Sequence, residues 1–402
     1  MKSSQKRAKP LRTDKDRHET LNKVDFVSAH WLKVLIKALP LVILAYTLIM
    51  YILSFNIPVT VENRLDELQI TGFVAYAAIF YLAQVAFTSA SGLFVELWER
   101  NIFHKDANAD LDRFSKHIEN LANHKVWQII FLLGALLIPL AGTLRSCLEQ
   151  NATGLDLLFC NFHKGGLRTS KSVFEIVIGV CLTLVVWRVF VAAWGIRKIG
   201  YKFDIIPNWH HPDKSGGLLP IGTTSFWIAS VLAVPAIYLG FWRILCANQG
   251  MAICDNIFRL ESRLLYFREL LFIVLVASLL SFVWPLWATH QVMVKKRDKL
   301  QHDELRAIGQ KINEVSRQII DNVNRVSEKD LEGQKALDEN ILLQKKLDAL
   351  QKAYLDLEQL PVWPFNKNTI LQLISTQGIP LLGLTGIGSK ILDFLKILFK
   401  QG

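Results

Sequence analysis

The sequence lacks the short signatures that identify common enzyme classes. It has no HExxH or CxxC pair, which would indicate zinc, and no GxSxG or kinase signature. Neither glycine-rich stretch forms a nucleotide loop. "GGLLPIG" has neither a preceding predicted strand nor the P-loop lysine, and "GLTGIGSK" lacks the required spacing. No recognised motif therefore assigns a catalytic activity or a cofactor, and we expect no cofactor.

Charged residues are also scarce. Only 20% of the 402 residues are charged, 51% are hydrophobic, and the mean hydropathy is +0.27. A soluble chain of this length is usually less apolar. The formal net charge of +11 does not indicate a nucleic-acid-binding protein, because the basic residues gather beside apolar runs and no base-reading module is present. We expect no nucleic-acid partner.

Long apolar runs are what the sequence has instead. About 20 apolar residues in a helix cross the hydrocarbon core of a bilayer. Six such runs lie at approximately 31–55, 71–97, 126–144, 173–196, 218–245 and 266–289. We therefore expect an all-α polytopic transmembrane bundle of about six spans, at residues 30–290 and surrounded by the lipid bilayer. The first run does not read as a cleaved signal peptide, because its polar leader is long and no small-residue cleavage site follows.

The basic residues orient this bundle. The leader, residues 1–29, holds eight lysines and arginines, and the sixth run is followed at once by Lys295, Lys296, Arg297 and Lys299. Lysine and arginine resist transfer across the membrane, so both flanks are expected on the cytoplasmic side. An even number of spans makes the two assignments agree. We expect both termini in the cytoplasm of a bacterium, with the chain in its inner membrane.

Four cysteines fall in the predicted external loops. Cys147 and Cys160 follow the third run, and Cys246 and Cys254 flank the loop after the fifth. Disulfides persist in an oxidising external space. One bridge per loop is the simplest of the three pairings, and four unpaired cysteines are the alternative.

The segment at 291–360 has a different pattern, charged and nearly free of aromatic residues. Its apolar residues follow steps of three and four, which predicts a coiled coil or helical hairpin on the cytoplasmic side. The first stretch contains Leu305, Ile308, Ile312, Val315, Ile319, Val323 and Val326, and the second contains Leu343, Leu347, Leu350, Tyr354 and Leu357. The two stretches are out of phase. An antiparallel hairpin turning near residues 329–333 is favoured over one continuous helix with a stammer. We expect homo-oligomers through this segment, or a cytoplasmic protein partner.

A hairpin would return the chain to the membrane at "PVWPF", residues 361–365. The final segment, 361–402, is predicted to be a tail at the membrane interface, with an amphipathic helix at 390–400. A seventh span at 369–387 is the alternative.

The segment "FDIIPNWHHPDKSGGLLPIG", residues 203–222, has two interpretations. Proline, aspartate and paired glycines are typical of a turn, here one that leads into the fifth span. Alternatively, His211 and Asp213 bind a divalent metal together with His117 and His124, which lie seven residues apart in another cytoplasmic loop. The turn is the favoured interpretation.

Polar residues inside the spans bear on transport. Gln84, Thr88, Ser89 and Ser91 in the second run suit either close helix packing or a pore lining, and packing is the commoner use. Arg188, in the fourth run, lies close enough to the inner membrane edge for its side chain to reach the interface.

The region from Trp187 to Trp242 resembles a family of bacterial multi-pass membrane proteins whose activity is not established. The matching pattern is "WR" in one span followed by a proline, an HPDxxGGL motif and a glycine-containing span. It falls here on Trp187, Arg188, Pro207, His211, Pro212, Asp213, Gly216, Gly217 and Leu218. This sequence departs by placing Asn208, Trp209 and His210 before the triplet. The resemblance covers about one seventh of the chain. It implies a bacterial membrane protein and transfers no activity.

These observations lead to one main functional hypothesis and two alternatives. We expect a non-enzymatic, oligomeric signalling, scaffold or channel-like membrane protein with a cytoplasmic coiled-coil assembly module. The alternatives are a membrane-embedded metal-dependent enzyme with a cytoplasm-facing His/Asp site, and a transporter.

Overall fold

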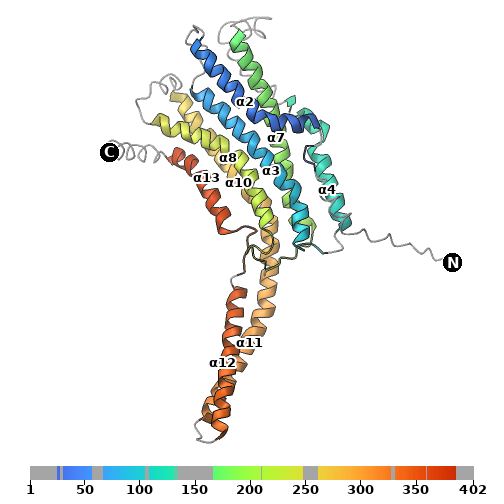
Figure 1. Ribbon diagram of the computed structural model, residues 1–402, viewed down its shortest axis with the longest axis vertical. Helices are drawn as coiled ribbons and strands as arrows, with labels where there is room; N and C mark the ends of the chain where they lie inside the picture. The colour runs from blue at the N-terminus through green and yellow to red at the C-terminus, as the bar shows by residue number, and fades with distance from the viewer. Residues whose placement is uncertain are drawn as a thin grey trace, which may run out of the picture.

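The computed structural model describes residues 25–27, 30–56, 67–104, 108–130, 132–133, 166–209, 211–247, 261–326, 331–358 and 360–385 (Figure 1). Within these ranges the chain is helical and contains no β-strand, only an isolated antiparallel bridge between Phe103 and Ile205. The main helices are α2 (His30–Asn56), α3 (Glu67–Glu99), α4 (Asn108–Ala122), α7 (Gly166–Lys202), α8 (Leu219–Ala247), α10 (Glu261–Leu300), α11 (Arg306–Val326), α12 (Leu331–Glu358) and α13 (Lys367–Thr385). The predicted all-α class is confirmed.

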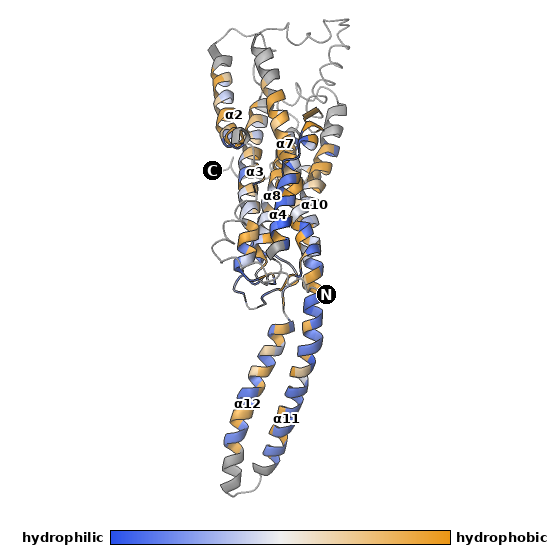
Figure 2. Ribbon diagram, turned by 90° about the vertical axis from the view of Figure 1, so that its right-hand side faces the viewer, coloured by the Kyte–Doolittle hydropathy of each residue, from blue (hydrophilic) through white to orange (hydrophobic). Residues whose placement is uncertain are grey.

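Five helices are long and apolar enough to cross a membrane. They are α2, α3, α7, α8 and α10, and they match the first, second, fourth, fifth and sixth predicted runs. Apolar residues dominate these helices, whereas α11 and α12 mix apolar and polar residues (Figure 2). The third predicted run, 126–144, lies mostly outside the described residues. The chain is therefore an all-helical membrane protein.

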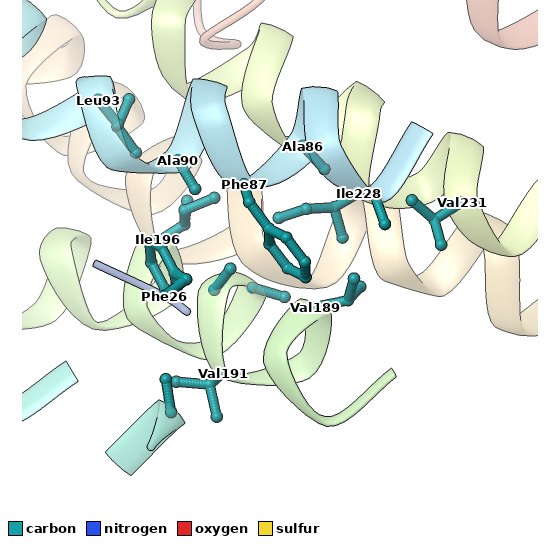
Figure 3. Packing of buried hydrophobic residues seen from close by; sticks show 14 of the residues in the cluster. Phe26, Ala86, Phe87, Ala90, Leu93, Val189, Val191, Ile196, Ile228 and Val231 are labelled. Atoms are coloured by element: carbon teal, nitrogen blue, oxygen red, sulfur yellow. The ribbon is translucent and has the colours of Figure 1, made fainter. Parts of the chain in front are cut away.

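Small residues let the spanning helices approach closely. Along α3, Ala86 and Ala90 are buried on either side of Phe87, whose ring points into the cluster shared with α7 and α8 (Figure 3). Ile228 from α8 and Val189 from α7 complete this contact. Since lipid tails are as apolar as leucine, packing of this kind rather than hydrophobic burial holds helices together in a membrane.

Helix α13 lies along α8 and runs in the same direction. At one end, a Cβ atom on Gly222 would meet the backbone of Pro364, and at the other end one on Gly383 would meet the backbone of Gly240. Two facing glycines allow this contact because neither has a side chain to separate the helices. The sequence predicts a tail at the membrane interface over residues 361–402, with a seventh span at 369–387 as the alternative, and the position of this segment relative to the membrane stays a prediction. Residues 390–400 lie outside the described residues.

Helices α11 and α12 form an antiparallel pair that projects from one end of the bundle, here called the hairpin (Figures 1 and 2). Helix α10 continues into α11 through a π-helical turn at Gln301–Leu305. Near the bundle, Gln301 Nε2 donates to the carbonyl oxygen of Leu357 at 2.8 Å. Near the far end, Asn322 Nδ2 donates to Glu339 Oε2 at 3.4 Å. The structure thus has the antiparallel arrangement rather than one continuous helix. Coiled-coil packing and a cytoplasmic location stay predictions.

Candidate functional site at the hairpin end of the bundle

The loop between α7 and α8 carries the HPD motif, and we call residues 203–218 the HPD loop. It pairs with the chain that follows α3, through the bridge between Phe103 and Ile205 and a 2.8 Å hydrogen bond from Ile206 N to the carbonyl oxygen of Ile102. Asp204, in the same loop, forms a 2.6 Å ion pair with Lys296 of α10. The ends of three spanning helices are therefore connected beside the start of the hairpin.

Asp213 is the centre of the HPD loop. Its Oδ1 accepts hydrogen bonds from the backbone N–H groups of Ser215 at 2.9 Å and Gly217 at 3.1 Å, and its Oδ2 accepts one from Leu219 at 3.4 Å. Leu219 is the first residue of α8. The carboxylate therefore satisfies backbone donors that a helix start leaves without a partner.

Arg100, just beyond α3, completes the environment of Asp213. Its guanidinium lies 2.7 Å from Asp213 Oδ2 and 2.9 Å from Glu96 Oε1. The Asp213 side chain is only 6% exposed, so this ion pair is largely shielded from water. His211 Nδ1 lies 3.2 Å from Asp213 Oδ1 and 3.3 Å from the Asp213 backbone nitrogen. The arrangement fixes the end of α3 to the start of α8.

The two glycines of the motif adopt a conformation that most residues avoid. Gly216 has φ of 65° and Gly217 has φ of 79°, both in the left-handed region. A Cβ atom on Gly217 would also lie 2.7 Å from Cδ1 of Ile102. The predicted turn leading into the fifth span is confirmed, and it explains why the motif contains two glycines after the aspartate.

The four metal candidates do not come together. His211 and Asp213 contact each other, whereas the ring of His117 lies 6.0 Å from that of Trp194, and His124 is exposed beyond α4. Over the described ranges, no three His, Cys, Asp or Glu side chains form a group that would hold a metal ion. His210 lies outside these ranges. A metal site at these residues stays a prediction, while the geometry at Asp213 is that of a helix cap.

Arg188 occupies a position that the sequence does not predict. It is only 1% exposed, so its side chain ends inside the protein, and its position relative to the membrane interface stays a prediction. Nε donates to the carbonyl oxygen of Phe26 at 2.9 Å, and an η nitrogen donates to that of Leu184 at 3.1 Å. The physical reason is that the chain at Phe26 folds over α7 and supplies a backbone acceptor where a carboxylate would be expected. The apolar pair at Phe26 and Val27, at the end of a polar leader, is the sequence signal for this contact.

Residues 25–27 form a short strap that holds the start of α2 in place. Phe26 and Val27 are buried, and the ring of Phe26 stacks on that of Phe87 of α3. Asp25 forms an ion pair with Lys33, and its carbonyl oxygen accepts a hydrogen bond from Asn123 at 3.1 Å. The strap therefore fixes the point at which the basic leader joins the bundle.

The polar residues of the second span have packing roles. Gln84 Nε2 donates to the carbonyl oxygen of Ile36 in α2 at 2.7 Å, and Ser89 hydrogen-bonds Thr224 of α8 at 2.7 Å. Thr88 and Ser91 donate to carbonyl oxygens of their own helix, at 2.9 and 2.8 Å. Each of these side chains is used in joining or satisfying helices, which matches the commoner of their two predicted uses.

The hairpin returns to the bundle at a junction that we call the hairpin base. His290 of α10 has its Nδ1 2.8 Å from the carbonyl oxygen of Val362, and its ring stacks on Trp363 with centroids 3.8 Å apart. Trp363 in turn stacks on Phe365. The predicted return of "PVWPF" is therefore seen as a direct contact with α10.

The four predicted disulfide cysteines cannot be placed, because Cys147, Cys160 and Cys254 and the side chain of Cys246 lie outside the described residues. Cys181, within α7, is a buried free thiol.

A scan against protein-family models and searches of curated proteins and of solved structures found nothing that matches this chain. The resemblance to the HPDxxGGL family therefore stays a prediction carried by the motif residues.

Proposed function

We propose that the protein is a non-enzymatic, oligomeric membrane protein in which the hairpin is an assembly or signal-receiving module coupled to the span bundle. The supporting observation is that the hairpin is joined to the bundle at both of its ends. One arm is continuous with α10 through the π-helical turn. The other arm ends where Val362 and Trp363 contact His290. A force on either arm would therefore act directly on α10.

The second arm also leads into the bundle. A displacement of α12 would act through residues 361–365 on α13, which contacts α8 between Gly240 and Gly383. Helix α8 in turn is held to α3 through Asp213 and Arg100. This contiguous series of packed helices is the kind of connection that transmits a change between two parts of a protein.

The environment of Asp213 supports a structural rather than catalytic role for the HPD motif. Both carboxylate oxygens already accept hydrogen bonds, from three backbone N–H groups and from Arg100. A general acid or base needs a carboxylate oxygen within hydrogen-bond reach of the proton that it transfers, whereas both oxygens of Asp213 are directed at backbone N–H groups and Arg100. An enzyme or transporter would require a further site, and none of the contacts described here favours one.

The proposal includes the six predicted crossings, with the leader and the hairpin in the cytoplasm of a bacterium. Because α13 runs along α8 from the hairpin base to Gly240, it supports the predicted alternative of a seventh crossing, which would place the chain after Thr385 on the opposite side. Helices α3 and α7 end on the same side of the bundle, since Phe103 and Ile205 pair there. A chain that enters both helices from the opposite side must cross back between them. A third span at 126–144 would do so, and the helical residues 125–130 stand at its start. The lysines and arginines beside the hairpin favour the cytoplasm for this side.

The test is the oligomeric state of the full chain in detergent or lipid nanodiscs, measured by native mass spectrometry. The comparison is a variant in which a short Gly/Ser linker replaces residues 295–360. Because His290 and Val362 are in contact, a short linker is able to join the two ends. We expect an oligomeric full chain and a folded, monomeric variant. A full chain that is monomeric, or an oligomer that the deletion leaves unchanged, would contradict the proposal.

A further inference from the structure

In the half of the hairpin farthest from the bundle, four exposed apolar residues share one face. We call Ile320, Val323, Leu337 and Ile341 the tip patch. Their exposed fractions are 60%, 56%, 51% and 48%. The sequence places Val323 in the seam between the two helices, but the structure turns it outward. Apolar side chains scattered singly over a surface are normal, whereas a large contiguous apolar patch marks a site of interaction.

At the same level, the seam between the helices is polar. Asn322 and Asn340 are 9% and 8% exposed. Among the residues that the structure describes, Asn340 Oδ1 has no hydrogen-bond partner, and the side chain of Asn322 donates to Glu339 at 3.4 Å. Nearer the bundle, apolar side chains fill the seam as expected, since Val315 is buried and Ile312 and Leu347 are half-buried between the helices. The outer half of the hairpin therefore buries amides and exposes aliphatic side chains.

Helical geometry places the four patch residues on one side of the hairpin. Ile320, Val323 and Ile341 each follow a seam position by one residue, a rotation of about 100°. Leu337 lies four residues before Ile341 and so shares its face. Because α11 and α12 run in opposite directions, residues that follow seam positions face the same side of the pair. Their heights also match, since the contact of Asn322 with Glu339 fixes the register.

The width of the apolar stripe indicates how many neighbours it needs. Contact between two helices covers only a narrow seam of each helix. In the tip half of α11, Ile320 and Val323 lie beside the seam residue Ile319, so the apolar stripe is wider than that seam. A stripe of this width is typical of helices in a four-helix bundle. Buried asparagines are found at seam positions of coiled coils, where they specify register and the number of strands.

We propose that the tip patches of two copies pack together, so that two hairpins form a four-helix bundle at their outer halves. This inference rests on the proposed function, in which the hairpin is the assembly module. Two copies in one bilayer hold their hairpins in the same direction and at the same height. A two-fold axis along the membrane normal therefore brings identical patches into contact. Confinement to the bilayer also raises the effective concentration of the copies.

Neither terminal segment of the chain suits the tip patch. The leader that precedes the strap carries eight basic residues and few large apolar ones, which does not suit an aliphatic patch. The chain beyond Thr385 leaves α13 at the end that contacts Gly240, away from the hairpin. The patch itself is bordered by charges of both signs, including Arg317, Asp338 and Lys345, as expected for the polar rim of a protein interface.

The test compares two substitutions that differ only in the face they occupy. Ile341→Glu, the patch variant, puts one charge into the patch of each copy, and adding Ile320→Glu puts in a second. Leu342→Glu is the matched control, because Leu342 is 68% exposed on the same helix but precedes the seam residue Leu343 and so faces the other side. In the full chain in nanodiscs, we expect the patch variant to raise the dissociation constant by roughly 100-fold or more and the control to leave it unchanged. All three positions are already exposed, so the fold is expected to survive, and circular dichroism checks this.

The outcomes separate this inference from the proposed function. If the full chain assembles, the variant lacking residues 295–360 does not, and the patch variant still assembles like the wild type, the patch inference is overturned and the proposed function stands. Equal dissociation by Leu342→Glu would also overturn the patch assignment. If removal of residues 295–360 leaves assembly unchanged, the proposed function itself fails.

Discussion

The two ends of the hairpin differ in which side chains have contacts within the chain and which are left exposed. Where the hairpin meets the bundle, Asp213 has a partner for each oxygen, and His290 and Trp363 are stacked. At the tip, Asn340 is buried with an unused acceptor and Ile320 is exposed. The difference teaches that the contacts at Asp213 and at the hairpin base are formed within one chain, while the tip exposes aliphatic side chains as an interface does. Substitutions should therefore destabilise the first region and can stabilise the second.

The largest effect is expected at Asp213. In Asp213→Ala, the start of α8 loses its cap and Arg100 loses its buried partner, so the free energy of unfolding should fall by about 3 kcal/mol. Unfolding in mixed micelles with increasing SDS measures this change. Asp213→Asn keeps a hydrogen-bond acceptor but has no charge, so its free energy of unfolding should fall less than that of Asp213→Ala. Equal stability of Asp213→Ala and the wild type would show that the HPD loop does not hold α8 to α3.

The next effect is expected where α13 meets α8. In Gly383→Ala, the new Cβ would lie 2.7 Å from backbone atoms of Gly240, so the helices must separate at a cost of about 1–3 kcal/mol. Gly378→Ala is the control on the same helix, since a Cβ there meets nothing within 4 Å. Thermal unfolding in detergent compares the two. A lower midpoint for Gly378→Ala than for Gly383→Ala would contradict the contact.

An effect of opposite sign is expected at the hairpin tip. Asn340→Leu removes a buried acceptor that has no partner among the described residues, so the free energy of unfolding of the hairpin should rise by about 1 kcal/mol. Asn322→Leu should raise the free energy of unfolding by less, because the Asn322 side chain already donates to Glu339. Chemical denaturation followed by circular dichroism measures both. A loss of stability in Asn340→Leu would mean that the amide has a partner in the assembled protein.

The smallest effects on stability are pH-dependent, and they are expected with opposite sign at Asp204 and Glu119. The hydrogen bond from Lys296 is the main cause that lowers the pKa of Asp204, while burial, with Asp25 nearby, raises the pKa of Glu119. The contribution of Asp204 is present above the ordinary pKa of an aspartate and is lost as the pH falls through its lowered value. That of Glu119 is present in acid and is lost as the pH rises through its raised value.

At neutral pH, Asp204→Asn should therefore lower the unfolding midpoint and Glu119→Gln should raise it. The Glu119→Gln difference should shrink as the pH is lowered from roughly 8 to 4, whereas the Asp204→Asn difference should shrink only as the pH falls further, below the ordinary pKa of an aspartate and toward about 2. Thermal scans across both pH ranges measure them. Since Asp204 is more than half exposed, solvent screening keeps its effect small. Differences that stay constant with pH would show that neither carboxyl group titrates as its contacts indicate.

Much of the fold follows from the sequence because hydrophobic length and spacing are local properties. The five matched runs and the turn at Asp213 are examples, since each depends on residues close together in the chain. The acceptor of Arg188 is different, because Phe26 lies 162 residues away and offers only a backbone carbonyl. The contact of Gly240 with Gly383 is also long-range, and glycine in a single sequence reads equally well as a helix breaker. At Val323, periodicity alone does not distinguish a two-helix seam from the wider core of a four-helix assembly.

The central claim is that the hairpin tip is completed by a second copy, and its most direct test is a distance between copies in the membrane. A spin label at Val323→Cys, in a background in which serine replaces the native cysteines, reports that distance by pulsed dipolar spectroscopy in lipid nanodiscs. Since packed helices lie about 8–10 Å apart, we predict an intermolecular distance on the order of 20 Å with the labels included. Ile341→Glu should abolish it and Leu342→Glu should not. An assembled protein with no intermolecular coupling at this position would contradict the account.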